Sequence, residues 1–236
     1  MSPYEMIFKR KSVRKYAQVP LEPQVLQEIA AFAATLRPLH SHIRTGYELT
    51  DAVKGVFAIK APHYLLITSE TADGYLENAG FMWQQMDLYL SSLGLGACWL
   101  GMAKPTGEIK TQLPLVITLA VGQPAEPVHR APADFKRKPL PEISTGADER
   151  LEAARLAPSA TNSQNWFFEA EAGAIHVYRK KLNPALELMY GKMSRIDAGI
   201  ALCHLCIATE ERGGVFSFSQ VSGRSRKGYE YVGTVK

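Results

Sequence analysis

A weak internal repeat with a period of about 120 residues constrains the fold of this chain more than any other feature. Ala33-Ala34-Thr35-Leu36-Arg37-Pro38 parallels Ala153-Ala154-Arg155-Leu156-Ala157-Pro158, and Ala79-Gly80 up to Gly94 parallels Ala198-Gly199 up to Gly213. One register relates both pairs, although chance similarity between Ala-rich helices is an alternative because alanine and leucine favour helices generally. With 236 residues, 46% of them hydrophobic, the chain can bury a core as one large domain or as two packed halves.

The charge and the hydropathy of the chain exclude several classes of protein. The N-terminus, Met1 to Lys15, lacks the apolar core of a signal peptide, and no later run is long enough to span a membrane. We therefore expect a cytoplasmic protein without a membrane partner. The net charge of +4 is modest for this length and does not predict a nucleic-acid partner.

Apolar periodicity and helix-breaking residues predict alternating helices and strands. We expect helices over residues 3–9, from 23 to about 37, and over 73–93, 147–157 and 194–212. We expect strands over residues 62–68, 115–121, 167–169 and 174–178, two short strands near Phe216 and Tyr231, and an extended segment over 12–16. A Pro- and Lys-rich connector separates the two series of elements.

The cysteines and histidines do not predict a metal site. Cys203 and Cys206 have the spacing of a redox or metal pair, but they fall at helical spacing with apolar neighbours, which indicates a core helix. No second pair completes a tetrahedral set of ligands, and His40 and His42 belong to no ligand pattern.

The first segment with chemical potential is Arg10-Lys11-Ser12-Val13-Arg14-Lys15-Tyr16. In an extended chain, Arg10, Ser12 and Arg14 point to one side, so two guanidinium groups and a hydroxyl can converge on one anion. A second basic run, 136–138, follows in the connector. Either cluster could instead be a solvated face, and a nucleic-acid or targeting role lacks interleaved aromatic residues.

Two further segments carry donors and glycines. Pro158-Ser159-Ala160-Thr161-Asn162-Ser163-Gln164-Asn165-Trp166 is a dense polar row on an expected loop, where binding groups concentrate, unless it is an ordinary capped turn. Gly94-Leu95-Gly96-Ala97-Cys98-Trp99-Leu100-Gly101 follows a helix and spaces its glycines wrongly for a dinucleotide fingerprint. We expect a turn there, whose glycines let the backbone approach a flat ligand.

Together the three segments resemble the nitroreductase family of FMN enzymes, and the resemblance extends to Val121-Gly122-Gln123-Pro124-Ala125-Glu126. It implies an α+β, nitroreductase-like (FMN-dependent) fold. It also implies that the FMN phosphate is held by Arg10, Lys11, Ser12 and Arg14 with Lys136 and Lys138. Pro158, Ser159, Ala160 and Asn162 would contact the flavin from the opposite side, and Trp99, Leu100 and Gly101 would bring backbone amides to the ring edge. No side chain is expected to be catalytic and no metal is expected.

The order of these segments departs from the family pattern. In family members the Pro-Ser loop precedes the Gly-Leu-Gly turn, whereas here it comes after it, and residues 38–42 stand at the expected place. Family members are homodimers that take this loop from the partner subunit. The resemblance therefore implies a tandem duplication, with halves 1–125 and 145–236 joined by connector 126–144, that forms a monomeric pseudo-dimer with one flavin. The region of Asn162 must then face that of Arg14 across a shared cleft. Asn165 replaces the family's proline and is expected to loosen the loop.

The resemblance implies an oxidoreductase that takes hydride from NADH or NADPH and passes electrons to a nitroaromatic, quinone or similar acceptor. One alternative is a non-catalytic flavin- or ligand-binding protein that keeps the fold. Another is a flavin enzyme of different specificity, such as a dehalogenase or dehydrogenase. The sequence does not select the acceptor or the nicotinamide donor.

Overall fold

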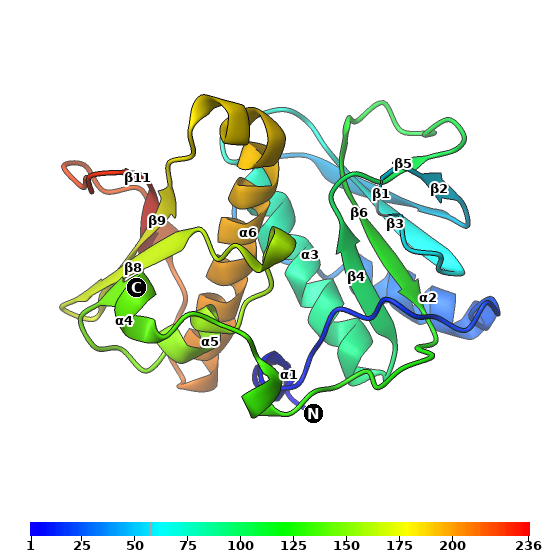
Figure 1. Ribbon diagram of the computed structural model, residues 1–236, viewed down its shortest axis with the longest axis horizontal. Helices are drawn as coiled ribbons and strands as arrows, with labels where there is room; N and C mark the ends of the chain where they lie inside the picture. The colour runs from blue at the N-terminus through cyan, green and yellow to red at the C-terminus, as the bar shows by residue number, and fades with distance from the viewer. Residues whose placement is uncertain (57) are drawn as a thin grey trace.

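Two antiparallel sheets flank a central pair of long helices in the computed structural model, which describes residues 1–56 and 58–236 (Figure 1). The helices are α1 (Pro3–Ile7), α2 (Pro23–Ala33), α3 (Tyr75–Ser92), α4 (Leu140–Ile143), α5 (Leu151–Arg155) and α6 (Pro184–Glu211), with 3-10 turns η1 (Pro132–Asp134) and η2 (Ala160–Asn162). The strands are β1 (Thr45–Thr50), β2 (Val53–Lys54), β3 (His63–Ser69), β4 (Gly96–Leu100), β5 (Lys104–Pro105), β6 (Leu115–Gly122), β7 (Ser144–Thr145), β8 (Trp166–Glu171), β9 (Ala174–Lys180), β10 (Phe218–Ser219) and β11 (Tyr229–Val235). The α+β class predicted from the sequence is confirmed.

The two sheets have the same order of strands. The first runs β1-β3-β6-β4 and the second runs β8-β9-β11-β10, with antiparallel neighbours throughout. The second sheet has one additional strand, β7, which pairs in parallel with β8 at the outer edge. β2 and β5 form a separate two-stranded ribbon.

The central helices α3 and α6 pack backbone to backbone at two glycines. A Cβ atom on Gly80 of α3 would clash with the carbonyl oxygen of Ile196, and one on Gly199 of α6 would clash with that of Glu77. The two contacts are reciprocal, because each glycine meets the residue three positions before the other glycine. Gly80 and Gly199 are also the glycines that the internal repeat aligns. The crossing therefore has local two-fold symmetry.

The core elements agree with their sequence patterns. β3 is buried along its whole length, as its continuous apolar run predicts, and β6 is buried beyond its first residue. Cys203 and Cys206 are buried free thiols inside α6, which confirms their interpretation as core residues. Within the described residues, no cluster of three or more His, Cys, Asp or Glu side chains could hold a metal ion. None of the helices described is both long and apolar enough to cross a membrane.

Several boundaries differ from the prediction, each for a local reason. Residues 96–100 form the edge strand β4 paired with β6 instead of a turn. β1 was not predicted because Tyr47 and Leu49 are the only large apolar residues among its six positions. α6 begins at Pro184, ten residues before the predicted start, because Asn183 accepts a hydrogen bond from the Leu186 N–H as an N-cap. Its first turns are exposed, with Leu188 92% accessible, although Leu186, Met189 and Tyr190 stand at helical spacing there.

A methyl group at the glycine crossing should destabilise the protein. We expect Gly199→Ala to lower the free energy of unfolding by about 1–3 kcal/mol or more, because the new atom has no space and the backbone must move. Urea denaturation measures this change. Gly107→Ala is the control, since its Cβ would meet no atom within 4 Å, and we expect a change within about 0.5 kcal/mol. Equal stability of the two variants would contradict the close packing.

Candidate active site

A cleft lies between the N-terminal segment with β4 on one wall and the loop after α5 with α6 on the other. We call it the central cleft. Its lining residues are Ser12, Arg14, Cys98, Trp99, Gly101, Ile117, Pro158, Ser159, Ala160, Thr161, Met193, Ile196, Asp197 and Ile200. The structure therefore brings the Arg14 region and the Pro158 to Asn162 region together across one opening, although they are more than 140 residues apart in sequence.

An adjoining cleft shares Ser12, Arg14, Pro158, Ser159 and Thr161 with the central cleft and is strongly basic. We call it the basic cleft. Its other lining residues are Lys11, Arg130, Asp134, Lys136, Arg137 and Asn162. Five cationic side chains thus face a single carboxylate. This imbalance is the signature of a site for an anion with more than one negative charge.

The arginines of the basic cleft are electrostatically strained. Burial, followed by repulsion from Arg130 and Arg10, lowers the pKa of Arg137 to about 9. Burial and repulsion from Arg10 likewise lower the pKa of Arg130 to about 10. Arg137 Nε is buried with no hydrogen-bond partner among residues 1–56 and 58–236. A bound anion would relieve both the repulsion and the unpaired donor.

The extended segment of the first motif is fixed against β4 and the connector. Val13 N–H donates to the Ala97 carbonyl at 3.0 Å, and Ser12 forms a parallel bridge with Ala97. Glu126 Oε1 accepts the Arg14 N–H at 2.7 Å and the Lys15 N–H at 3.3 Å. These bonds hold the backbone so that Ser12 and Arg14 line both clefts.

Three of the residues predicted from the resemblance line neither cleft. Arg10 is fully buried, with Nε 3.0 Å from Asp87 Oδ2 on α3, because a carboxyl group buried there needs a cationic partner. It reaches the site only through its Nη2, which donates to Ser12 Oγ. Lys138 Nζ donates to the Ser163 and Gln164 carbonyls, and Leu100 packs in a small apolar cluster with Val13 and Tyr16. The remaining ten line one cleft or both.

The polar loop is held by its own side chains in an uncommon backbone conformation. Thr161, Asn162 and Gln164 all have positive φ angles, between 50° and 58°. Asn162 Oδ1 accepts Arg137 Nη1 at 2.6 Å, and its Nδ2 donates to the Lys136 carbonyl. Gln164 Oε1 accepts the Lys138 N–H at 2.7 Å. The loop and the basic connector therefore hold each other.

Sequence analysis missed the contribution of α6. Met193, Ile196, Asp197 and Ile200 line the central cleft from this helix, at the i, i+3, i+4, i+7 spacing of one helical face. Arg130 and Arg137 were also not selected, although both lie in the basic connector. A charged residue in an otherwise apolar run, at Asp197, was the available signal.

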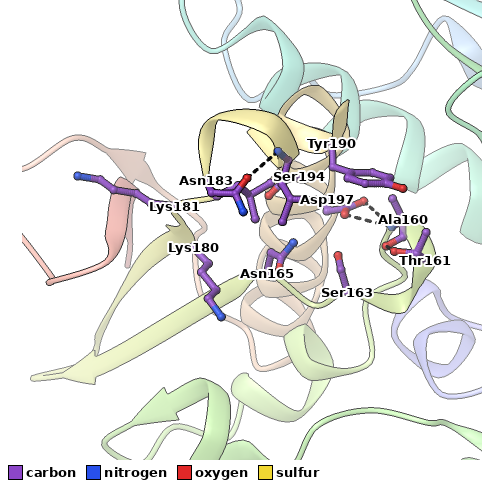
Figure 2. A pocket seen from close by; sticks show the side chains of 12 residues that line it. Ala160, Thr161, Ser163, Asn165, Lys180, Lys181, Asn183, Tyr190, Ser194 and Asp197 are labelled. Carbon is purple, nitrogen blue, oxygen red and sulfur yellow. Dashed lines mark hydrogen bonds between the residues drawn. The ribbon is translucent and has the colours of Figure 1, made fainter. Parts of the chain in front are cut away.

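Asp197 is a buried carboxyl group without a cationic partner among the described residues. Both of its oxygens lie 3.1 Å from the Ala160 nitrogen, and the residue is 5% exposed (Figure 2). Burial raises the pKa of Asp197 to about 8, against the opposing effect of the Ala160 N–H. The group is therefore largely protonated at neutral pH and can donate a hydrogen bond.

On its other side, Asp197 borders a third opening, which we call the α6 pocket (Figure 2). Its lining residues are Ala160, Thr161, Ser163, Asn165, Lys180, Lys181, Leu182, Asn183, Leu186, Tyr190, Ser194 and Asp197. Figure 2 shows Tyr190 beside Asp197 and Ala160, whereas Lys180 and Lys181 extend away from Asp197. Asp197, Ala160 and Thr161 thus form a wall between the α6 pocket and the central cleft.

The comparisons with known proteins agree with this architecture. Residues 3–209 match the family model described as "Putative TM nitroreductase". The chain belongs to this family. A crystal structure of a putative nitroreductase from Thermotoga maritima has a TM-score of 0.69 at 20% identity and covers 100% of this chain and 92% of its own. At this identity the likeness establishes the nitroreductase-like fold.

Shorter members of the nitroreductase family align with part of the chain. A nitroreductase family protein from Clostridium difficile 630 is 18% identical and covers 63% of this chain and 99% of its own, with a TM-score of 0.49. An FMN-dependent nitroreductase from Clostridium difficile R20291 is 19% identical and covers 56% and 93%, with a TM-score of 0.44. None of the curated proteins matches the chain significantly.

Replacing Asp197, the buried acid, should change how the free energy of unfolding depends on pH. Because the pKa of Asp197 is raised by folding, the contribution of this group to stability is full below about pH 4, the unfolded value, and is lost as pH rises to about 8. We expect Asp197→Asn to gain stability relative to wild type across that window, by up to about 5 kcal/mol. Urea denaturation at several pH values measures the difference.

Asp148→Asn provides the matched control. Hydrogen bonds from Arg150 hold the pKa of Asp148 below its usual value against the effect of burial, so its contribution is fully present above about pH 4. The difference between this variant and wild type should be constant from pH 5 to pH 8. A constant difference for Asp197→Asn as well would contradict a protonated Asp197.

Proposed function

We propose that this protein is an FMN-dependent oxidoreductase that takes hydride from NADH or NADPH and passes electrons to a small acceptor such as a quinone or nitroaromatic. The observation that carries the proposal is the junction of the basic cleft with the central cleft. FMN has the matching shape and charge, since it joins a doubly charged phosphate to a flat tricyclic ring. Membership of the nitroreductase family supports the same assignment.

The donor set of the basic cleft suits a phosphate. Lys11, Arg14, Lys136 and Arg137 would supply charge-assisted hydrogen bonds, and Ser12 would add a hydroxyl donor. Arg130 supports the site from the side, because its Nε donates to the Arg10 carbonyl and its guanidinium stacks on Phe135 at 3.7 Å. Arg10 would act indirectly, by positioning Ser12.

The central cleft suits the ring. Trp99 and Gly101 bound one side, and the Pro158 to Thr161 loop bounds the other. A Cβ at Gly101 would clash with the Met193 sulfur atom, so a larger residue there would displace the Met193 side chain that lines the same cleft. When bound, the flavin would supply hydride chemistry, while the chain binds and orients it and limits access of water.

We also propose that the fold arose by tandem duplication, with halves at residues 1–125 and 145–236 joined by a basic connector. The shared strand order of the two sheets and the reciprocal glycine contacts of α3 and α6 support this origin. Each half gives one wall of the clefts, so we expect one flavin per monomeric chain.

Removing a phosphate contact should weaken FMN binding selectively. We expect Arg14→Ala to raise the Kd for FMN roughly 10- to 100-fold, the loss of one charged hydrogen bond, and to leave riboflavin binding almost unchanged. Quenching of flavin fluorescence measures both constants. Arg44→Ala is the control, because Arg44 is an exposed arginine paired with Glu70 on another part of the surface. An equal loss for FMN and riboflavin would argue against a phosphate at Arg14.

Stoichiometry and turnover test the proposed function directly. We expect light scattering to give the mass of one chain and absorbance to give one flavin per chain. Anaerobic NADH or NADPH should bleach the bound flavin, and 1,4-naphthoquinone should restore its colour. Protein that binds no FMN would reject the proposal, and a bound flavin inert to both nicotinamides would indicate a flavin-binding protein without turnover.

A further inference from the structure

Asp197 has a counterpart in the first half of the chain. It precedes Ala198-Gly199 on α6 just as Asn78 precedes Ala79-Gly80 on α3, in the register of the internal repeat. Asn78 Oδ1 accepts the Leu39 and His40 N–H groups at 2.8 and 2.9 Å. Asp197 accepts the N–H of Ala160, which the repeat aligns with His40. Both side chains therefore hold the loop that follows the preceding proline.

This comparison separates two roles of Asp197. An amide holds the loop in the first half with two hydrogen bonds, so anchoring does not require a carboxyl group. Burying an acid without a cationic partner costs free energy or a proton, whereas an amide at the same place carries no charge, although Asn78 Nδ2 is itself buried with no hydrogen-bond partner among the described residues. The first-half loop lines neither the central cleft nor the basic cleft, whereas the second-half loop lines both. The carboxyl group thus occurs in the half whose loop lines the proposed flavin site.

We propose that the Asp197 carboxyl group is the proton donor to the acceptor that is reduced in the central cleft. This inference rests on the proposed flavin function. For a quinone, two electrons and one hydrogen would arrive as hydride from bound reduced flavin, and a quinone oxygen would take the proton from Asp197, so the product is the hydroquinone. The carboxylate left behind regains its proton from water in the α6 pocket, which it also borders.

The groups around Asp197 favour this assignment. On the central-cleft side the other ionisable side chains are Arg14 and Cys98, and burial raises the pKa of the Cys98 thiol. On the pocket side they are Lys180, Lys181 and Tyr190, and neither lysine pairs with Asp197. The Ala160 loop contributes no ionisable side chain. Asp197 is therefore the one carboxyl group among the described residues that line either opening, and it lines both.

The α6 pocket contains a group suited to return the proton. Ser194 lies one turn before Asp197 on the same helix face and lines the same pocket. Its Oγ is buried and has no hydrogen-bond partner among the described residues. A hydroxyl both donates and accepts, so it can connect pocket water to the carboxylate.

The test compares wild type with Asp197→Asn, using Asn78→Asp as the matched variant in the other half. FMN-loaded protein is reduced with dithionite and mixed with 1,4-naphthoquinone in a stopped-flow instrument between pH 5 and pH 10. We expect the wild-type reoxidation rate to fall about tenfold per pH unit above the pKa of the acid. Asp197→Asn should be slower by roughly 10²- to 10⁴-fold at pH 6 and insensitive to pH, whereas Asn78→Asp should retain the wild-type profile.

Two measurements without turnover accompany the kinetics. Infrared spectra of the flavin-free protein should show a protonated carboxyl band that titrates near pH 8 in wild type and is missing in Asp197→Asn. The Kd of Asp197→Asn for FMN should stay within about threefold of wild type, because the amide oxygen still accepts the Ala160 N–H.

The outcomes distinguish the two proposals. A wild-type protein that binds no flavin overturns both. Flavin that binds and is reduced, with the same pH profile in wild type and Asp197→Asn, overturns the proton donor alone and leaves the carboxyl group with an anchoring role.

If Asn78→Asp does not fold, Ser194→Ala takes its place. In Ser194→Ala the reoxidation rate should still fall above the pKa of Asp197, and repeated turnover should slow more than the single reoxidation does. A wild-type rate of repeated turnover would overturn the path through the α6 pocket.

Discussion

The contact between α3 and α6 at Gly80 and Gly199 is the constraint on which the clefts depend. Two helices can approach this closely only where both lack a side chain, and here each glycine rests on a carbonyl group of the other helix. β4 follows α3 directly, and the face of α6 one turn from Gly199 lines the central cleft. The separation of the two helices therefore fixes the distance between Trp99 on one wall and Asp197 on the other.

Buried charges divide into pairs that hold the fold and groups that remain uncompensated. Arg10 and Asp87 tie the N-terminal segment to α3. Arg179 pairs with Glu187 and Glu230, and Arg195 pairs with Glu77 and Glu230, so β9, β11 and α3 hold the early turns of α6. Within the described residues Asp197 lacks such a partner, and of the five cationic side chains of the basic cleft only Lys11 forms a salt bridge, with Glu126. These uncompensated groups mark the region where ligands are expected.

Much of the architecture could be predicted from the sequence because the patterns that indicate it lie within short segments. A continuous apolar run gave β3, helical periodicity gave the middle of α3, and three short motifs identified the regions that line the clefts. The sequence could not show that Arg10 turns inward, because its partner Asp87 is distant along the chain and extended geometry alone puts Arg10 beside Arg14. It could not show Asp197 in the cleft either, since helical periodicity places the residue on a face but does not say what covers that face. The exposed start of α6 carries Leu186, Met189, Tyr190 and Met193 at helical spacing after Asn183 and Pro184, so its earlier boundary could have been predicted from the sequence.

The walls of the clefts come from segments near residues 12, 99, 160 and 197, so almost the whole chain must be made before they can meet. Contacts between such distant segments form late, after the local helices and hairpins. A ribosome-bound chain that ends before α6 has the first arginines but no opposing face. Capture of a ligand by these clefts would thus report that the chain has been made and folded at least through Ile200, and a product truncated before α6 could not compete for it.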